Sequence, residues 1–304
     1  MTVRQKALAA IIACVIFWGV SFISTKVAVK VFPPMSLGLL RFALALVFLF
    51  FIKIKLAPKE KLNARDIPLL FGAGLTGVTL YFFFENNGIA LVTASEASIA
   101  IGSIPVLSMI ADWLIQKISS RKSGMAHNAL KAYQWLGALI SIAGVWLVAG
   151  VSFAFSGSVL GYVYMAGAAL SWVAYSFLTR PLFTRCSRIH IVFWQTVFGF
   201  ICFIPFSVIE FSKWGRPDVP VILHLLFLGI FCSALGYWFY ARALETLGVS
   251  VCAIFINVIP IITVACGFIT LGERLKPLQW LGTALVIAGV YLAMLEKKAA
   301  ARRC

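Results

Sequence analysis

Apolar residues occupy this chain in long runs that are separated by short polar stretches. Each run has about 20 residues, which is long enough for a helix to cross a hydrocarbon core of about 30 Å. No polar stretch between the runs is long enough to fold as a soluble domain. The pattern predicts an all-α integral membrane protein with ten transmembrane helices, at about 7–29, 35–54, 67–91, 95–116, 133–152, 159–180, 189–211, 219–242, 250–272 and 277–295.

The small and polar residues inside these runs occur twice in the same order. LGALISIAGVWL at 136–147 returns as LGTALVIAGVYL at 281–292, and each copy follows a Gln-Trp pair. Two further segments also have counterparts, 18–26 at 172–180 and 97–105 at 252–260. We therefore predict two five-helix repeats, residues 1–152 and 153–304. A duplicated membrane unit is typical of transporters.

The basic residues predict the orientation of the chain. Nineteen of the 26 Lys and Arg residues fall in the termini and connections that ten spans with a cytoplasmic N-terminus place inside. This bias follows the positive-inside rule and places both termini in the cytoplasm. We therefore expect the basic residues behind the net charge of +16 to orient the protein in the membrane beside anionic lipid. We expect no nucleic-acid partner. Because each repeat has an odd number of spans, the two repeats must be inverted relative to each other.

Composition agrees with a membrane protein and gives no sign of an enzyme. The chain is 62% hydrophobic and 12% charged, with a mean hydropathy of +0.99. It lacks the HExxH, phosphate-loop and nucleophile-elbow motifs that mark common active sites. Six of the seven cysteines lie in or beside apolar runs, and His127, His190 and His224 have no partner at metal-ligand spacing. We expect no catalytic activity, no cofactor and no metal.

The ordered set of motifs resembles EamA-type proteins of the drug/metabolite transporter superfamily. The resemblance rests on Trp18-Gly, Ala97-Ser98 through Pro105, Gly272-Glu273-Arg274, and Gln279-Trp280-Leu-Gly followed by Ala288-Gly289-Val290. It implies a multi-pass carrier of the bacterial inner membrane with a central cavity between the two halves. It also implies that the first, third, fourth, sixth, eighth and ninth segments line this cavity, while the second and seventh support it.

Two ionisable residues lie inside predicted spans, where charge is costly and needs a reason. Glu85 shares one face of the third segment with Tyr81 and Gly88. Its carboxylate could bind a substrate ammonium group or carry a proton. Arg41 lies at a similar depth in the second segment, and aligns with Gln195 of the second repeat. An ion pair between Arg41 and Glu85 is the alternative, and the two readings can coexist because such a pair can open on binding.

Aromatic and hydroxyl side chains form stripes that occur in both repeats. Such faces suit an amphipathic solute with an apolar body, although ordinary helix packing is the alternative for any single residue. The candidate substrate-binding residues are Trp18, Ser21, Thr25, Tyr81, Glu85 and Ser98 in the first repeat, and Trp172, Tyr175, Thr179, Tyr237, Tyr240 and Asn257 in the second. Pro105 and Pro260 occupy equivalent positions, and we expect them to bend their helices and act, with Arg41, in gating.

These observations predict an alternating-access carrier for a small molecule in the lipid bilayer. The family resemblance implies that amino acids or related amphipathic metabolites are the solutes and that they are moved outward. The alternative is a proton-coupled exporter of organic cations in which Glu85 is essential. We expect a monomer or a weak homodimer, with protons as a candidate coupling ion.

Overall fold

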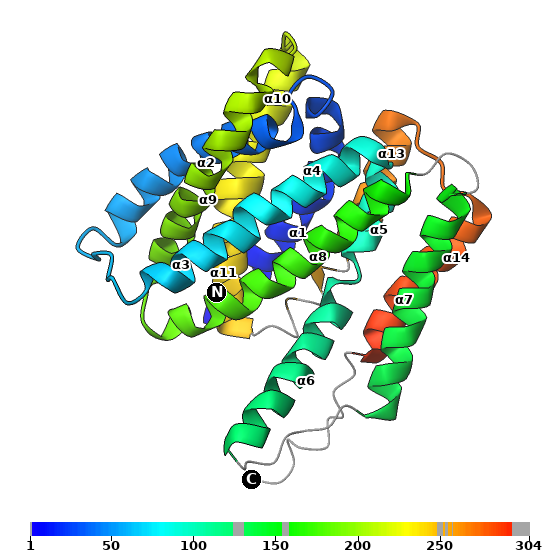
Figure 1. Cartoon of the computed structure of the whole chain (residues 1–304), viewed down its shortest axis with the longest axis horizontal. Helices are drawn as coiled ribbons and strands as arrows, with labels where there is room; N and C mark the ends of the chain where they lie inside the picture. Colours follow the sequence, from blue (N-terminus) through cyan, green and yellow to red (C-terminus); the bar gives the residue numbers. More distant parts are fainter. Residues whose placement is uncertain are drawn as a thin grey trace.

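A computed structural model describes residues 2–123, 131–153, 158–247, 252, 255–256 and 258–293. All regular structure in these residues is helical, which confirms the predicted all-α class. Figure 1 shows the helices packed side by side as a bundle. The α-helices are α1 (Val3–Ala28), α2 (Pro34–Leu56), α3 (Ile67–Gly74), α4 (Tyr81–Leu91), α5 (Ala94–Ile101), α6 (Ile104–Ser123), α7 (Ala132–Phe153), α8 (Val159–Thr179), α9 (Arg188–Glu210), α10 (Val219–Phe227), α11 (Gly236–Leu247), α13 (Ile259–Leu271) and α14 (Pro277–Ala293).

Four shorter helical segments connect or extend these helices. Two are π-helical, η1 (Leu75–Leu80) and η4 (Leu228–Leu235), and they join α3 to α4 and α10 to α11 without a break. The other two are 3₁₀ turns, η2 (Arg180–Thr184) and η3 (Phe211–Lys213).

Seven helices among the described residues are long and apolar enough to cross a membrane by length and composition: Val3–Ala28, Pro34–Leu56, Ile67–Leu91, Ala94–Ile118, Val159–Thr184, Arg188–Lys213 and Val219–Leu247. Three shorter apolar helices cover Ala132–Leu147, Ile259–Leu271 and Pro277–Leu292. The protein is therefore a multi-pass membrane protein. The count of ten spans and the cytoplasmic termini stay predictions.

Local sequence signals account for the helix ends. Thr93 begins α5 with a capping box, because its hydroxyl accepts from the Glu96 amide while Glu96 accepts from the Thr93 amide. Ser187 and Asp218 cap α9 and α10 in the simpler way, through one side-chain oxygen. Gly272 ends α13 with a φ of 65°, a left-handed conformation that glycine adopts without steric cost.

The helices pair in a pattern that is unchanged when the two repeats are exchanged. Helices α2 and α9, which are equivalent by sequence, pack on each other, and so do α7 and α14. Helix α4 packs on α8, and α1 packs on α11. Because α1 is equivalent to α8 and α4 is equivalent to α11, an exchange of the repeats converts one of these pairs into the other. The core therefore lies along the contact between the two halves of the chain (Figure 1).

Glycines bring α7 and α14 into close contact. A Cβ atom added at Gly144 would come within 2.6 Å of the Gly282 carbonyl oxygen and 2.7 Å of the Val286 amide nitrogen. One added at Gly289 would come within 2.6 Å of the Gly137 carbonyl oxygen. The two helix backbones can approach this closely only because these side chains are absent.

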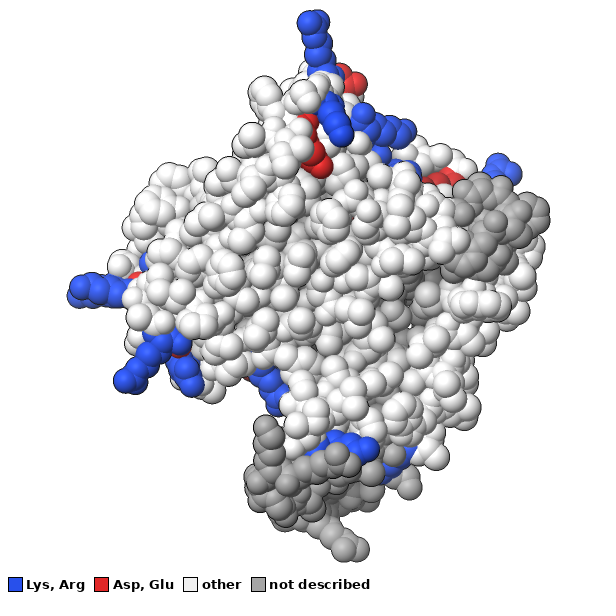
Figure 2. All heavy atoms as spheres, in the orientation of Figure 1, with Lys and Arg blue, Asp and Glu red and all other residues white. Residues whose placement is uncertain are grey.

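The outer surface is apolar over a wide band. Large side chains such as Ile269, Ile209 and Trp146 are more than 70% exposed, which fits a lipid-facing surface rather than a water-facing one. Figure 2 shows a broad surface without charged side chains on one face, with Lys and Arg side chains gathered at the edges of the molecule. The basic side chains thus lie outside this uncharged surface, and the predicted orientation stays a prediction.

Candidate functional site

A central cavity lies where the two halves meet. It is lined by Trp18, Ser21 and Phe22 of α1, Arg41 of α2, Tyr81, Phe82 and Glu85 of α4, Ile101 and Ile104 at the α5–α6 break, Trp172 of α8, Tyr237 of α11, and Ile256 and Ile259 near the start of α13. Its volume of about 30 Å³ is room for about two water molecules. A larger solute therefore needs the helices to move apart.

Two opposite charges face this cavity without forming an ion pair. Arg41 and Glu85 are 2% and 4% exposed, and no ion pair of the described residues joins them within 4.0 Å. Glu85 accepts a hydrogen bond from the Tyr81 hydroxyl at 2.8 Å. Arg41 donates from Nε to the Ser233 hydroxyl at 2.9 Å, and its Nη1 has no hydrogen-bond partner. The direct ion pair considered from the sequence is not formed here.

The guanidinium of Arg41 lies against an aromatic ring. Its Cζ is 4.1 Å from the centroid of Phe82, close enough for a cation–π interaction. This contact and the Ser233 bond leave the Nη1 edge of the guanidinium unbound in a buried site. Helix α2 therefore contributes directly to the cavity, whereas the family resemblance had implied a supporting role for it.

Aromatic rings from both repeats form one cluster at the cavity. The Trp18 ring lies 5.3 Å from Trp172 in an edge-to-face arrangement, and 5.9 Å from Tyr237. Tyr240 packs on both tryptophans, and Tyr175 lies 5.0 Å from Trp172. The edge-to-face arrangement of Trp18 with Trp172 and with Tyr237 is one that aromatic pairs favour. The two equivalent tryptophans, predicted as a matched pair, thus meet at the centre of the molecule.

The remaining sequence-predicted candidates fall into three groups. Thr25, Ser98 and Thr179 are buried but do not line the cavity, and the Ser98 hydroxyl donates to the Ser95 carbonyl within its own helix. Tyr175 and Tyr240 stand behind the lining residues as part of the aromatic cluster. Asn257 lies outside the described residues. A substrate-binding role for each stays a prediction.

The π-helical segments help to position the aromatic residues. The Tyr237 hydroxyl donates at 2.6 Å to the Gly77 carbonyl, which lies within η1. Gly77 has no side chain, so the Tyr175 ring packs directly on the backbone of η1. Single π-helical turns are frequent at functional sites. Here the hydrogen bond from Tyr237 joins the second repeat to η1 of the first.

Pro105 and Pro260 interrupt their helices at equivalent places. Helix α5 ends at Ile101, and α6 begins at Ile104 with Pro105 in its first turn. Helix α13 begins at Ile259 with Pro260 as its second residue. Proline fits the first turn because the missing N–H has no partner within the helix there. Each proline thus lies in the first turn of a described helix, and the bends and their role in gating stay predictions.

A network that the sequence reading missed joins the two repeats at the α4–α5 corner. Glu273, in the turn after α13, accepts from the Ala94 amide at 3.0 Å, from the Ser95 amide at 3.0 Å and from the Ser95 hydroxyl at 2.6 Å. Lys26 of α1 donates at 2.6 Å to the carbonyl oxygens of Ile89 and Val92 at the end of α4. The Glu273 carboxylate thus binds the N-terminus of α5, and the Lys26 ammonium group binds the C-terminus of α4. Each charge is opposite in sign to the partial charge of the helix end that it contacts.

The fold and the site together describe a helical membrane protein with a small central cavity between two similar halves. The family model of the EamA-like transporter family matches residues 5–150 and again residues 159–295. The chain therefore belongs to the EamA-like transporter family, as its sequence motifs had indicated.

Relatives with similar length carry transporter names. A "Probable terminal-alkyne amino-acid exporter" of Streptantibioticus cattleyicolor is 27% identical over 95% of this chain and 93% of the relative. A "Probable amino-acid metabolite efflux pump" of Escherichia coli is 26% identical over 91% of each chain. An "Uncharacterized transporter" of Archaeoglobus fulgidus is 28% identical over 93% of this chain and 96% of the relative. One solved protein crystal structure shares the fold, with a TM-score of 0.63 and 19% identity over 99% of this chain and all of the other.

Proposed function

We propose that the protein is a secondary transporter of the bacterial inner membrane that exports amino acids or closely related metabolites by alternating access. The observation that supports this most directly is the unpaired Arg41 and Glu85 in one cavity. The names of the two relatives above point to the same class of solute. The proposal assigns Glu85 to the substrate ammonium group and Arg41 to the substrate carboxylate.

The charges favour a zwitterion over a solute with a single charge. A buried charge without a counter-charge costs several kcal/mol, and this site holds one of each sign. A zwitterionic amino acid offers both counter-charges at a short separation. The free Nη1 edge of Arg41 suits a carboxylate, which guanidinium groups bind through paired hydrogen bonds. An organic cation would satisfy Glu85 and leave Arg41 without a counter-charge.

The aromatic rings favour a solute with an apolar side chain. Trp18, Trp172 and Tyr237 present flat apolar surface to the same cavity that holds the two charges. Binding sites of this kind combine an apolar wall with a few fixed polar groups that set orientation. The cavity holds only about two water molecules, which is too little for a solute with an apolar side chain. We infer that the aromatic rings that line the cavity move apart when such a solute binds, and that its apolar side chain lies between them.

Alternating access is supported by the doubled architecture. Two family matches, 5–150 and 159–295, divide the chain as the predicted repeats do. The helix pairs are unchanged when the two repeats are exchanged. In inverted repeats, an exchange of the conformations of the two halves converts a form open to one side of the membrane into a form open to the other side. The seven spans and three shorter apolar helices fit ten crossings with both termini on one side.

The experiment compares three ligands that differ only in charge. Purified protein is heated with an apolar amino acid, with the amine that lacks its carboxylate, and with the acid that lacks its ammonium group. A bound ligand raises the unfolding temperature by mass action, and we expect the amino acid to give the largest increase. An equal or larger increase with the amine would instead favour the organic-cation exporter.

Two variants then assign the charges. Glu85→Gln should remove the response to the amino acid and the amine, and Arg41→Gln should remove the response to the amino acid and the acid. Glu210→Gln is the matched control, because its carboxylate binds the Ser36 amide and hydroxyl and does not line the cavity. If Glu85→Gln and Arg41→Gln both keep the wild-type response to amino acids, the assignment is wrong.

A further inference from the structure

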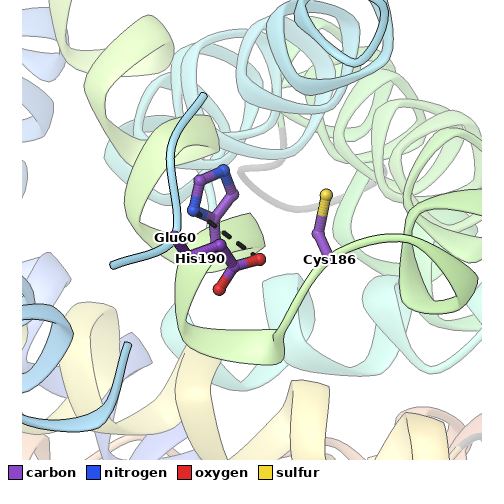
Figure 3. A group of neighbouring side chains, drawn as sticks. All are labelled: Glu60, Cys186 and His190. Atoms are coloured by element: carbon purple, nitrogen blue, oxygen red, sulfur yellow. Dashed lines mark ion pairs between the residues drawn. The ribbon is translucent and has the colours of Figure 1, made fainter. Parts of the chain in front are cut away.

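Three metal-ligating side chains meet away from the cavity, at the end of the bundle that the charge pattern assigns to the cytoplasm. Glu60 lies in the connection between α2 and α3, Cys186 in the connection between α8 and α9, and His190 in the first turn of α9. One potential ligand atom from each lies within 4.8 Å of the other two. Figure 3 shows the Glu60 carboxylate beside the His190 ring, with the Cys186 side chain on the neighbouring loop.

The imidazole of His190 lacks a hydrogen bond on the side that faces this group. His190 is 1% exposed, and its Nδ1 has no hydrogen-bond partner. Glu60 Oε1 lies 3.8 Å from this nitrogen, beyond hydrogen-bond distance. A buried nitrogen with no partner is costly, and it needs a water or an ion. The cluster therefore has an open ligand position that points at the carboxylate.

Glu60 is held in place by contacts that leave it free to bind further. Its two carboxylate oxygens accept from the Ser187 amide, at 2.8 Å, and from the Ser187 hydroxyl. A carboxylate has about four acceptor positions, so one on Oε1 remains for a ligand beside His190. These contacts act as the outer hydrogen bonds that orient metal ligands in known sites.

We propose that Glu60, Cys186 and His190 form a binding site for a divalent transition metal ion of the zinc class. Sulfur, imidazole nitrogen and carboxylate oxygen are the three ligand types that Zn²⁺ takes in proteins. Ligand atoms around tetrahedral Zn²⁺ are about 3.3–3.8 Å apart, given bonds of about 2.0–2.3 Å. The distance of 3.8 Å between His190 Nδ1 and Glu60 Oε1 already lies at the end of this range, and a separation at the 4.8 Å limit would shorten by about 1 Å. Two of the ligands lie on connections between helices, where such a shift is feasible.

The remaining coordination position has a candidate nearby. Asp66 Oδ2 lies 3.7 Å from the Cys186 sulfur, while Asp66 Oδ1 pairs with Arg185 at 3.4 Å. Either water or this carboxylate completes a four-coordinate site. A bound ion ties the connection at 57–66 to the start of α9, and so links the first repeat to the second. This site is independent of the proposed substrate and its transport.

The test is a Co²⁺ titration of metal-stripped, full-length protein that carries no histidine tag. Co²⁺ stands in for Zn²⁺ and gives a thiolate-to-metal absorption band only when a cysteine sulfur is bound. We expect saturation at a single ion per chain, displacement by Zn²⁺, and loss of the band in Cys186→Ser. His190→Gln should weaken binding by at least the 10- to 100-fold that is typical of outer-shell changes.

Matched variants control for other thiols and imidazoles. Cys202→Ser changes a thiol on the same helix, about 18 Å along the axis from His190. His224→Gln changes a histidine whose Nδ1 already contacts the Ser24 hydroxyl at 3.1 Å. Both should bind Co²⁺ as the wild type does. Binding that survives in the Cys186→Ser/His190→Gln double variant, or no saturable binding to wild type, would overturn the proposal.

A second measurement needs no variant. Zn²⁺ added to wild-type protein should slow alkylation of Cys186, read by peptide mass spectrometry, and leave Cys202 and Cys266 unchanged. Unchanged Cys186 alkylation in saturating Zn²⁺ would also refute the site.

Discussion

The turn that carries Glu273 should detach from α5 when its carboxylate is changed to an amide. Glu273→Gln keeps the side-chain length but replaces one acceptor oxygen with a donor, while three donors of Ala94 and Ser95 face it. At least one donor is left unsatisfied, which costs about 1–3 kcal/mol. The lost attraction between the charge and the N-terminus of α5 adds about 0.3–1 kcal/mol.

These terms sum to about 1.3–4 kcal/mol, which is about a 10- to 900-fold shift toward the detached turn at 1.36 kcal/mol per factor of ten. Hydrogen exchange with mass spectrometry on protein in nanodiscs measures it. The amides of 94–101 should exchange faster by up to this factor in Glu273→Gln. Arg274→Gln, an exposed neighbour in the same turn, is the control. Equal exchange in wild type and Glu273→Gln would refute the reasoning.

Three further perturbations test other parts of the structure. Gly144→Val places a side chain against the Gly282 carbonyl and the Val286 amide, so overpacking between α7 and α14 should cost about 1–3 kcal/mol in a thermal unfolding assay. Tyr237→Phe leaves the Gly77 carbonyl without its donor and should cost about 1–3 kcal/mol in the same assay, with the exposed Tyr291→Phe unchanged. Burial, with the carboxylates of Asp66 and Glu60 adding to it, raises the pKa of the Cys186 thiol to about 11. Because the thiolate is the reactive form, alkylation of Cys186 should be slow at neutral pH and accelerate toward pH 11, and Asp66→Asn should move this profile to lower pH. A profile that does not move in Asp66→Asn would contradict the assigned contribution of that carboxylate.

Periodicity and repetition were enough to predict the architecture and much of the cavity. The runs of apolar residues predicted the helices, since a helix satisfies its own backbone inside lipid. Trp18 and Trp172 were found because they repeat, and Glu85 because a carboxylate inside an apolar run is costly. All three residues line the cavity.

The rest depends on how helices from distant parts of the chain meet. Ser95 and Glu273 are 178 positions apart, and no local pattern links a capped helix to a turn in the other repeat. His190 looked isolated although Cys186 lies four positions before it, because Glu60, the third side chain of the group, lies 130 positions before His190 and far outside any metal-ligand spacing. Arg41 was found as a buried charge, but its free Nη1 edge and the absence of the Glu85 ion pair required the packed structure.

The central claim is that the protein carries amino acids by alternating access, and countertransport tests it most directly. Proteoliposomes loaded with an unlabelled apolar amino acid are diluted into a trace of the same amino acid in labelled form. A carrier brings labelled solute into the vesicle as it carries unlabelled solute out. The amount of label inside should therefore rise transiently above its equilibrium level. This overshoot should be absent in Glu85→Gln and present in Glu210→Gln. Wild-type protein that admits the label only to equilibrium, without an overshoot, would contradict the account.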